Sequence, residues 1–310
     1  MDTRRISTAD TRLANNYDVI DDRKERMIVT QRSTNARKML FRIDLRSVMG
    51  EERKWAVIDY INEYKGIHLL PCMTSLGESF RDGNAFYVAH ALTDDVTLRQ
   101  ELMTSQSKGV QLDEASIRTW MRQILMALCS LHVRKVVHGA VTSSNVFVVG
   151  SNNQVRLGPS DEFLRMTRSA HDLQQQISSV RNPRTVTPTS RDVTSQFREN
   201  EESMECLEHL APESFNATGN VDPSNDIWAL GVMTYKLTTG NAPFSGQTPV
   251  HFAQAIQKQD PDWRTMQRRG YSDELIAVVK NMLQKEPAKR MTAQHLLNHQ
   301  YFRDVINSIA

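Results

Sequence analysis

A helix with almost no polar face is the feature that most constrains the fold of this chain. Residues Asp226 to Leu237 are apolar nearly all round at helical spacing, and such a helix lies inside a helical layer rather than on its surface. Residues Ile117 to Leu131 instead repeat apolar side chains three and four positions apart, which predicts a long amphipathic helix. Leu275 to Leu283 repeats that pattern. The second half of the chain is therefore predicted to be a helical body around one buried helix.

The first half of the chain predicts a small sheet with one packed helix. Between strand-like runs, Val48 to Tyr64 has a helical pattern with an apolar face. The residues predicted on that face are Trp55, Ile58 and Ile61. The short apolar runs that are typical of strands are Lys38 to Leu45, His68 to Met73 and Ala85 to Leu92.

Two polar stretches flank these patterns. We interpret residues 1–36 as an N-terminal extension that leads into one or two strands. Residues 160–210 are dense in Ser, Thr, Arg, Gln and Asn and hold few large apolar side chains. Such a composition buries too little apolar surface to offset the entropy of ordering. We therefore predict a long Ser/Thr-rich loop there, either an inert insertion or a docking segment.

Charge and cysteine content exclude several classes of function. Lys+Arg 38 against Asp+Glu 36 leaves a net charge of +2, so no overall field favours nucleic acid as a partner. Cys72, Cys129 and Cys206 form no CxxC pair and no Cys/His cluster with metal-ligand spacing, which argues against structural zinc. No apolar run has the length of a membrane span. We expect no nucleic-acid partner, no resident metal and no membrane span.

Four segments of the second half resemble the eukaryotic protein kinases. Leu210 to Glu213 is similar to the end of a kinase activation segment. The segment from Asp226 to Val232 is similar to the start of the buried helix of the large lobe. Gly240 to Phe244 resembles the loop that follows, and Lys289 to His299 the C-terminal signature. The resemblance implies an α+β, bilobal protein-kinase-like fold. Its small β-rich N-lobe with one helix would cover residues 37–92, and its larger helical C-lobe residues 93–310.

The same resemblance implies a set of residues that hold the architecture. Glu213 and Arg290 would form an ion pair of bidentate geometry, which ties the activation segment to the helical lobe. Asp226 and His138 would be structural residues, with His138 packed under the loop that follows it. None of these four would take part in catalysis.

The catalytic loop of the family aligns without a gap, but its reacting groups are replaced. The pattern His-Arg-Asp-Leu-Lys-Pro-x-Asn falls on residues 138–145. Ala140 stands at the position of the aspartate base, Thr142 at that of the phosphate lysine, and Gly139 at that of the arginine. Asn145 is retained, either as a metal ligand or, as we prefer, as a residue that bonds the loop backbone.

The phosphate-binding parts of the small lobe also depart from the family. No glycine precedes Gly50, so a conventional glycine-rich loop is absent. Arg42 stands at the position of the nucleotide lysine, although Lys38 keeps another register open. Spacing leaves open which helical carboxylate would face Arg42. The candidates are Glu51, Glu52, Asp59 and Glu63.

The metal-binding Asp-Phe-Gly of the family aligns with Pro159-Ser160-Asp161. Pro159 stands at the ligand position, and Asp161 would reach a cation only through a changed backbone path. Magnesium prefers oxygen ligands in near-octahedral geometry. Arg42, Asn145 and Asp161 are therefore weak candidates for nucleotide or metal contacts, and we expect no cofactor and no binding of ATP or magnesium.

These replacements predict a pseudokinase, a catalytically inactive kinase homologue that works as a protein-binding scaffold or allosteric regulator. The alternatives are an unorthodox kinase without a glycine loop, using Arg42, Asn145 and Asp161, and an ATP-binding switch. Because it lacks the glycine loop, the chain resembles a secreted apicomplexan group of kinases and pseudokinases that also lack this loop. Within it, the degraded catalytic loop is similar to that of a bradyzoite pseudokinase of Toxoplasma. That resemblance implies secretion into a parasitophorous vacuole or cyst wall.

Overall fold

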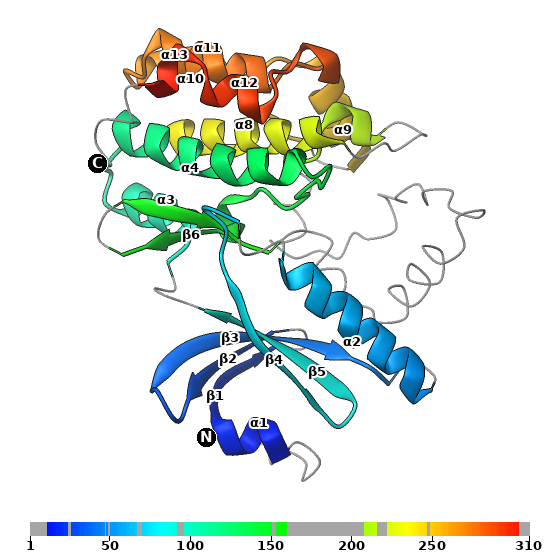
Figure 1. Ribbon diagram of the computed structural model, residues 1–310. Helices are drawn as coiled ribbons and strands as arrows, with labels where there is room; N and C mark the ends of the chain where they lie inside the picture. The colour runs from blue at the N-terminus through cyan, green and yellow to red at the C-terminus, as the bar shows by residue number, and fades with distance from the viewer. Residues whose placement is uncertain are drawn as a thin grey trace, which may run out of the picture. The chain divides into compact units, whose positions relative to one another are not determined.

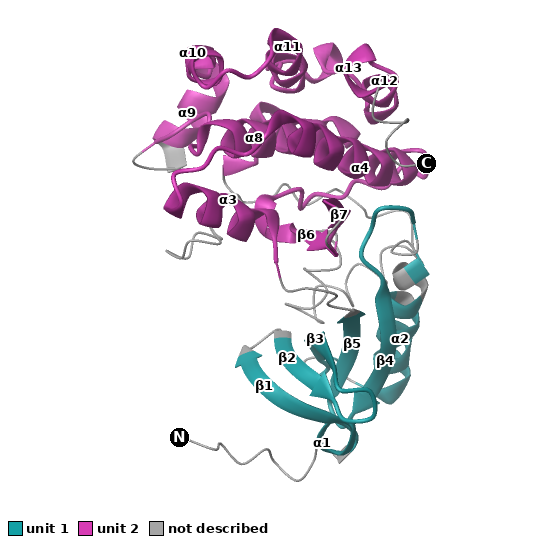
Figure 2. Ribbon diagram, turned by 90° about the vertical axis from the view of Figure 1, so that its left-hand side faces the viewer, with its two compact units in different colours: residues 1–93, 161–187 teal, residues 94–160, 188–310 magenta. Residues whose placement is uncertain are grey.

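The protein divides into two compact units. A computed structural model places residues 1–93 with 161–187 in the first unit and residues 94–160 with 188–310 in the second (Figure 2). The structure describes residues 11–23, 26–46, 48, 50–66, 70–91, 96–150, 153–159, 208–215, 222–246 and 249–303. Most of the Ser/Thr-rich stretch 160–210, with Asp161, lies outside the described residues.

A five-stranded antiparallel sheet forms the first unit (Figure 1). Its strand order is β1-β2-β3-β5-β4, so that β1 and β4 end the sheet. The strands are β1 (Tyr17–Arg23), β2 (Arg26–Gln31), β3 (Ala36–Asp44), β4 (Leu76–Asp82) and β5 (Ala85–Ala91). The sheet thus begins within the stretch that we interpreted as an N-terminal extension. The strand expected at His68 to Met73 is wrong over its described part, where turns lead into β4.

Alternation along β3 builds an apolar cluster on each face of this sheet. Phe41 and Ile43 pack with Ile61 of helix α2 (Glu51–Lys65). Leu40 points to the other face, because successive strand side chains alternate, and packs with Leu13 of helix α1 (Thr11–Asn16). Both helices therefore cover the sheet, one for each cluster.

Helix α2 corrects one expectation about its apolar face. Ile58 and Ile61 are buried, as the spacing predicts. Trp55 instead leaves 51% of its surface exposed, with the Arg81 guanidinium 5.4 Å from its ring. The indole therefore lies at the border of the covered face.

The second unit is built around the two helices that the sequence predicts. Helix α4 (Glu114–His132) is capped by Asp113, which accepts a 2.8 Å hydrogen bond from the Ser116 amide. Helix α8 (Pro223–Thr239) is buried nearly all round and ends at Gly240, whose φ of 79° is the left-handed conformation of a C-cap. The prediction of a helical body with one buried helix is confirmed.

Shorter elements complete this unit. Strands β6 (Val146–Val149) and β7 (Gln154–Leu157) form an antiparallel hairpin in which Val146 pairs with Leu157. None of the described helices is long and apolar enough to cross a membrane. The other described α-helices of this unit are α3 (Leu98–Ser107), α9 (Pro249–Lys258), α10 (Trp263–Arg268), α11 (Asp273–Met282), α12 (Ala293–Leu297) and α13 (Gln300–Arg303).

Candidate functional site

The loop of residues 138–145 connects helix α4 to strand β6 and is anchored by one buried carboxylate. Asp226, in the first turn of α8, is only 1% exposed. Its oxygens accept 2.8 Å hydrogen bonds from the backbone amides of His138 and Gly139. The His132 ring lies 2.8 Å from the same carboxylate. A carboxylate at a helix N-terminus is stabilised by the helix dipole, so Asp226 fixes where the loop starts.

His138 is fully buried beneath this loop. Its Nδ1 accepts a hydrogen bond from the Ala140 amide at 3.2 Å, which leaves Nε2 to donate to the Gly158 carbonyl at 3.0 Å. Both ring nitrogens are thus engaged by backbone groups. A ring in this arrangement holds two segments together and offers no free lone pair to a metal.

Asn145 connects the loop to the segment that follows β7. Its Nδ2 donates to the carbonyls of Ala140, at 2.9 Å, and Pro159, at 2.8 Å. Its backbone carbonyl accepts from the Gly158 amide at 2.7 Å. A Cβ on Gly158 would meet Asn145 Oδ1 at 2.1 Å, so only glycine fits here. The amide side chain is therefore packed against the protein on its donor and acceptor sides.

The replaced positions lie on the same loop. Gly139 has a φ of 73°, a conformation that favours glycine over the arginine of the family pattern. The Ala140 methyl can neither accept a proton nor orient a hydroxyl group. Thr142 stands at the N-cap position of a short 3-10 turn over Ser143–Asn145, where its side chain makes no capping hydrogen bond. Pro159 is buried, with its carbonyl bound to Asn145.

The arginine and lysine candidates of the first unit contact strand carboxylates. Arg42 on β3 lies 3.7 Å from Asp22 of β1, and Lys38 lies 2.8 Å from Glu78 of β4.

Of the four carboxylates of α2 that could face Arg42, the structure gives hydrogen bonds for one, Glu51. Glu51 accepts hydrogen bonds from Arg81 at 2.7 and 3.0 Å and from Lys54 at 3.1 Å. These bonds, Arg81 first, lower the pKa of Glu51 to about 2. Glu52 and Asp59 are exposed, and the side chain of Glu63 lies outside the described residues.

Glu213 and Arg290 meet in the geometry that the family resemblance implies. Arg290 Nη1 lies 2.5 Å from Glu213 Oε1, and Nη2 lies 2.7 Å from Oε2. The Arg290 side chain is 0% exposed and that of Glu213 13%. Arg290 also donates to the Gln284 carbonyl at 2.7 Å and stacks over Trp228 at 4.9 Å. The bidentate pair ties the 208–215 segment to α8 and the C-terminal helices.

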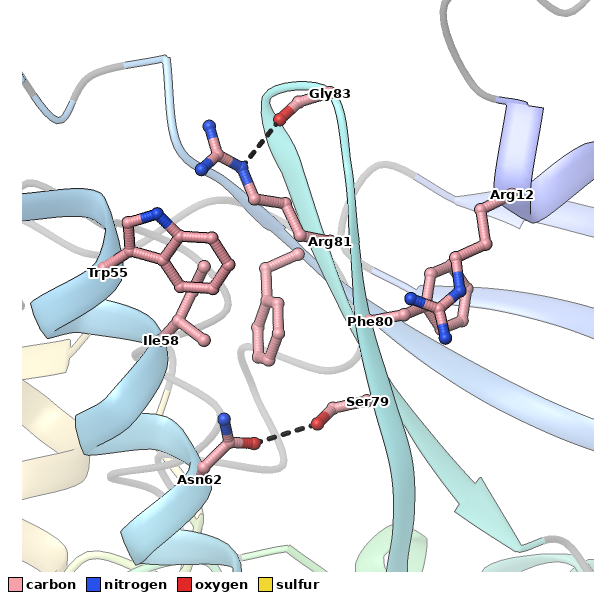
Figure 3. Close-up of a pocket in the computed structure, with 9 residues that line it drawn as sticks. Arg12, Trp55, Ile58, Asn62, Ser79, Phe80, Arg81 and Gly83 are labelled. Atoms are coloured by element: carbon pink, nitrogen blue, oxygen red, sulfur yellow. Dashed lines mark hydrogen bonds between the residues drawn. The ribbon is translucent and has the colours of Figure 1, made fainter. Parts of the chain in front are cut away.

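Within the described ranges, no group of three or more His, Cys, Asp and Glu side chains could hold a metal ion. A pocket that the sequence does not predict lies beside α2 and β4 (Figure 3). The helical spacing predicts Trp55 on the covered face of α2, so the sequence gives no sign that its side chain is half exposed beside this pocket.

Comparisons with known proteins agree with this architecture. The model of the protein kinase domain matches residues 189–302. The chain is 27% identical over 198 residues to germinal center kinase 3 of Caenorhabditis elegans, across 62% of this chain and 30% of that protein. It is 24% identical over 263 residues to 3-phosphoinositide-dependent protein kinase 1 of the same organism, across 82% of this chain and 40% of that protein. The chain thus spans less than half the length of these relatives.

Solved structures show the fold. A crystal structure of Rad53 in complex with AMP-PNP matches with a TM-score of 0.68 and 18% identity, across 94% of this chain and 66% of that one. The chain has the protein kinase fold, in the α+β class, with a β-sheet N-lobe and a helical C-lobe.

The comparisons contradict the expectation that this chain is not an enzyme. Germinal center kinase 3, 3-phosphoinositide-dependent protein kinase 1 and Rad53 are all named as kinases, so the relatives point to an enzyme. The expectation relied on the replaced residues Ala140, Thr142 and Pro159. Phosphoryl transfer depends mostly on positioning and on electrostatic stabilisation, which residues outside the family pattern can also supply. Replacement of these three residues is therefore not sufficient ground for expecting a chain without enzymatic activity.

Proposed function

We propose that this chain acts by binding a protein partner, as a scaffold or allosteric regulator built on the protein kinase fold. The observation that carries the proposal is that the retained polar groups of the 138–145 loop make hydrogen bonds to the backbone of this chain. Asn145 donates to two carbonyls of its own chain, and both ring nitrogens of His138 bond backbone groups. The Asp226 carboxylate accepts from two loop amides. These residues hold the loop in place, which keeps the lobe folded and its surfaces defined.

The helical unit supports this proposal by its intact architecture. The Glu213–Arg290 pair and the buried helix α8 maintain a rigid lobe, and a fold of this kind can serve functions other than its usual chemistry. A rigid surface loses little entropy on association, which favours protein partners.

Phosphoryl transfer by an unorthodox route is the second candidate, and the names of the relatives favour it. Such a mechanism would have to proceed without an aspartate at position 140 and without a glycine-rich loop. Arg42 on β3 would supply positive charge for the phosphates. Asn145 would offer its Oδ1 to a metal, while its Nδ2 keeps the bonds to the carbonyls of Ala140 and Pro159. An ATP-binding switch would need the same contacts.

Thermal melting with ATP and magnesium separates these candidates. A chain that binds no nucleotide keeps the same Tm, with magnesium alone as the control. An enzyme or a switch must hold ATP, and at 100 times its Kd the ligand adds about 2.7 kcal/mol to the free energy of unfolding. A saturable rise in Tm that needs both ATP and magnesium would replace the first candidate by the second.

The apicomplexan resemblance, with secretion into a vacuole or cyst wall, stays a prediction that rests on sequence pattern.

A further inference from the structure

Lys285, in the segment that follows helix α11, holds its amine against two stacked aromatic rings. Trp228 of α8 and Phe244 of the loop after α8 stack with ring centroids 5.6 Å apart and planes 7° from parallel. Lys285 Nζ lies 4.0 Å from the centroid of the Phe244 ring and 5.3 Å from a Trp228 ring centroid. Since Trp228 is fully buried and Phe244 is 3% exposed, one side of the amine faces an apolar surface.

The polar surroundings of this amine consist of a carbonyl and a second cation. Among the described residues, Lys285 Nζ hydrogen-bonds only the carbonyl of Ile256, in the last turn of α9. Arg290 lies 4.9 Å from the Trp228 ring, and its Nη2 donates to the backbone carbonyl of Lys285 at 3.3 Å. A cation stabilises the C-terminal turn of a helix, so Lys285 attaches the end of α9 to the core around α8.

Burial decides the charge state of this half-buried lysine. Loss of contact with water, first, and the nearby charge of Arg290 favour the neutral amine, whereas the carboxylate of Asp260 favours the ammonium form. Together they lower the pKa of Lys285 from 10.5 to about 8. At pH 7.5 about a quarter of the chains then carry a neutral amine, against about one in a thousand for an ordinary lysine.

We propose that Lys285 is a nucleophilic amine that small acyl phosphates acylate, and that this modification weakens the attachment of α9 to the helical unit. A desolvated lysine beside another cationic group is an arrangement that activates an amine as a nucleophile. The Nζ lone pair attacks the acyl carbon, so that a C–N bond forms and the C–O bond to phosphate breaks. Phosphate leaves with the electron pair of that bond and takes up the amine proton.

The product of this reaction is a neutral amide. It has no charge with which to stabilise the last turn of α9, and its remaining N–H donates a weaker bond to the Ile256 carbonyl than an ammonium group does. The inference goes beyond the proposed partner-binding function and does not depend on it.

Mass spectrometry that resolves each lysine of the folded full chain, treated with acetyl phosphate, tests the reactivity. Lys280 is the matched control, because its Nζ also lies over an indole, 5.5 Å from a Trp263 ring centroid, while its side chain is exposed. At pH 7.5 Lys285 should be acetylated about tenfold faster than Lys280 or more. The Lys285 rate should level off above about pH 9, whereas the Lys280 rate should continue to rise. Asp260→Asn, which removes an exposed carboxylate, should raise the Lys285 rate about twofold at pH 7.

Unfolding the chain in urea completes this test, because it removes the burial on which the reactivity of Lys285 depends. The two lysines should then react at equal rates. The proposed reactivity is overturned if Lys285 reacts no faster than Lys280 in the folded chain, if both rates have the same pH profile, or if the difference persists in urea.

The attachment of α9 is tested by melting two variants that copy the neutral amide. Lys285→Gln should lower the Tm by about 2–4 °C, as expected for the loss of one charged hydrogen bond. Lys280→Gln, at the exposed control position, should melt as the wild type does. Equal melting of Lys285→Gln and the wild type would show that acylation of Lys285 does not loosen α9.

Discussion

Removal of the Glu213–Arg290 pair should destabilise the protein strongly, because one buried charge would lose its partner. Breaking a buried pair costs about 3–5 kcal/mol. The structure ranks the two single variants. Arg290→Ala also loses the bond to the Gln284 carbonyl and the stacking on Trp228, so it should lie at the upper end. In Glu213→Ala the guanidinium keeps bonds to the carbonyls of Gln284 and Ser224, so the loss should be about 3 kcal/mol or slightly less.

Urea denaturation of the two single variants and the double variant measures this coupling. Residues in contact couple by about 0.5–3 kcal/mol, so the double variant should be clearly more stable than the sum of the single effects predicts. Arg268→Ala is the matched control, since its pair with Asp262 is exposed and spans 3.4 Å; it should change stability by less than about 1 kcal/mol. Small, additive effects of Glu213→Ala and Arg290→Ala would refute the reasoning.

Two further variants test the loop and the sheet. Gly158→Ala should lower the free energy of unfolding by about 1–3 kcal/mol, because its Cβ would overlap Asn145 Oδ1. Gly66→Ala is the control, since a Cβ at Gly66 would meet open space. Equal melting temperatures of the two variants would contradict the tight packing at Gly158. Burial lowers the pKa of His90 to about 4, below its ordinary value near 6.5. Since the unfolded chain takes up the proton first, wild-type stability should fall by about 3 kcal/mol as the pH drops from about 6.5 to 4. His90→Leu should reduce that pH dependence of the unfolding free energy, and an unchanged slope would show that His90 titrates normally in the fold.

The helical unit was predictable because its helices carry their own periodicity. Ile117 to Leu131 and Asp226 to Leu237 show their burial in the spacing of their apolar residues, and the structure places α4 and α8 there. Strand β1 carries no such pattern, because charged residues such as Asp21 and Asp22 interrupt its apolar ones. Its pairing with β2 is a long-range property that composition does not reveal.

The pocket was not predictable for a similar reason. Arg12, Trp55 and Arg81 are far apart in the sequence, and only the packing of two helices against one sheet brings them together. Trp55 has the spacing of a core residue, and the helical period alone cannot distinguish the centre of a covered face from its border. The loop of residues 138–145 was located by its pattern, but the bonds of Asn145 to two carbonyls required coordinates.

The most direct test of the central claim is the melting of Asn145→Ala with and without ATP and magnesium. If Asn145 holds the loop, the variant loses two hydrogen bonds, each worth about 1 kcal/mol, and its Tm falls by the same amount in both conditions. Asn281→Ala is the matched control, an asparagine that bonds the backbone amide of Met291 at 2.9 Å in another part of the lobe. The account predicts the same behaviour for both variants. A saturable stabilisation of the wild type by ATP with magnesium, lost only in Asn145→Ala, would contradict it and make Asn145 a ligand of the nucleotide complex.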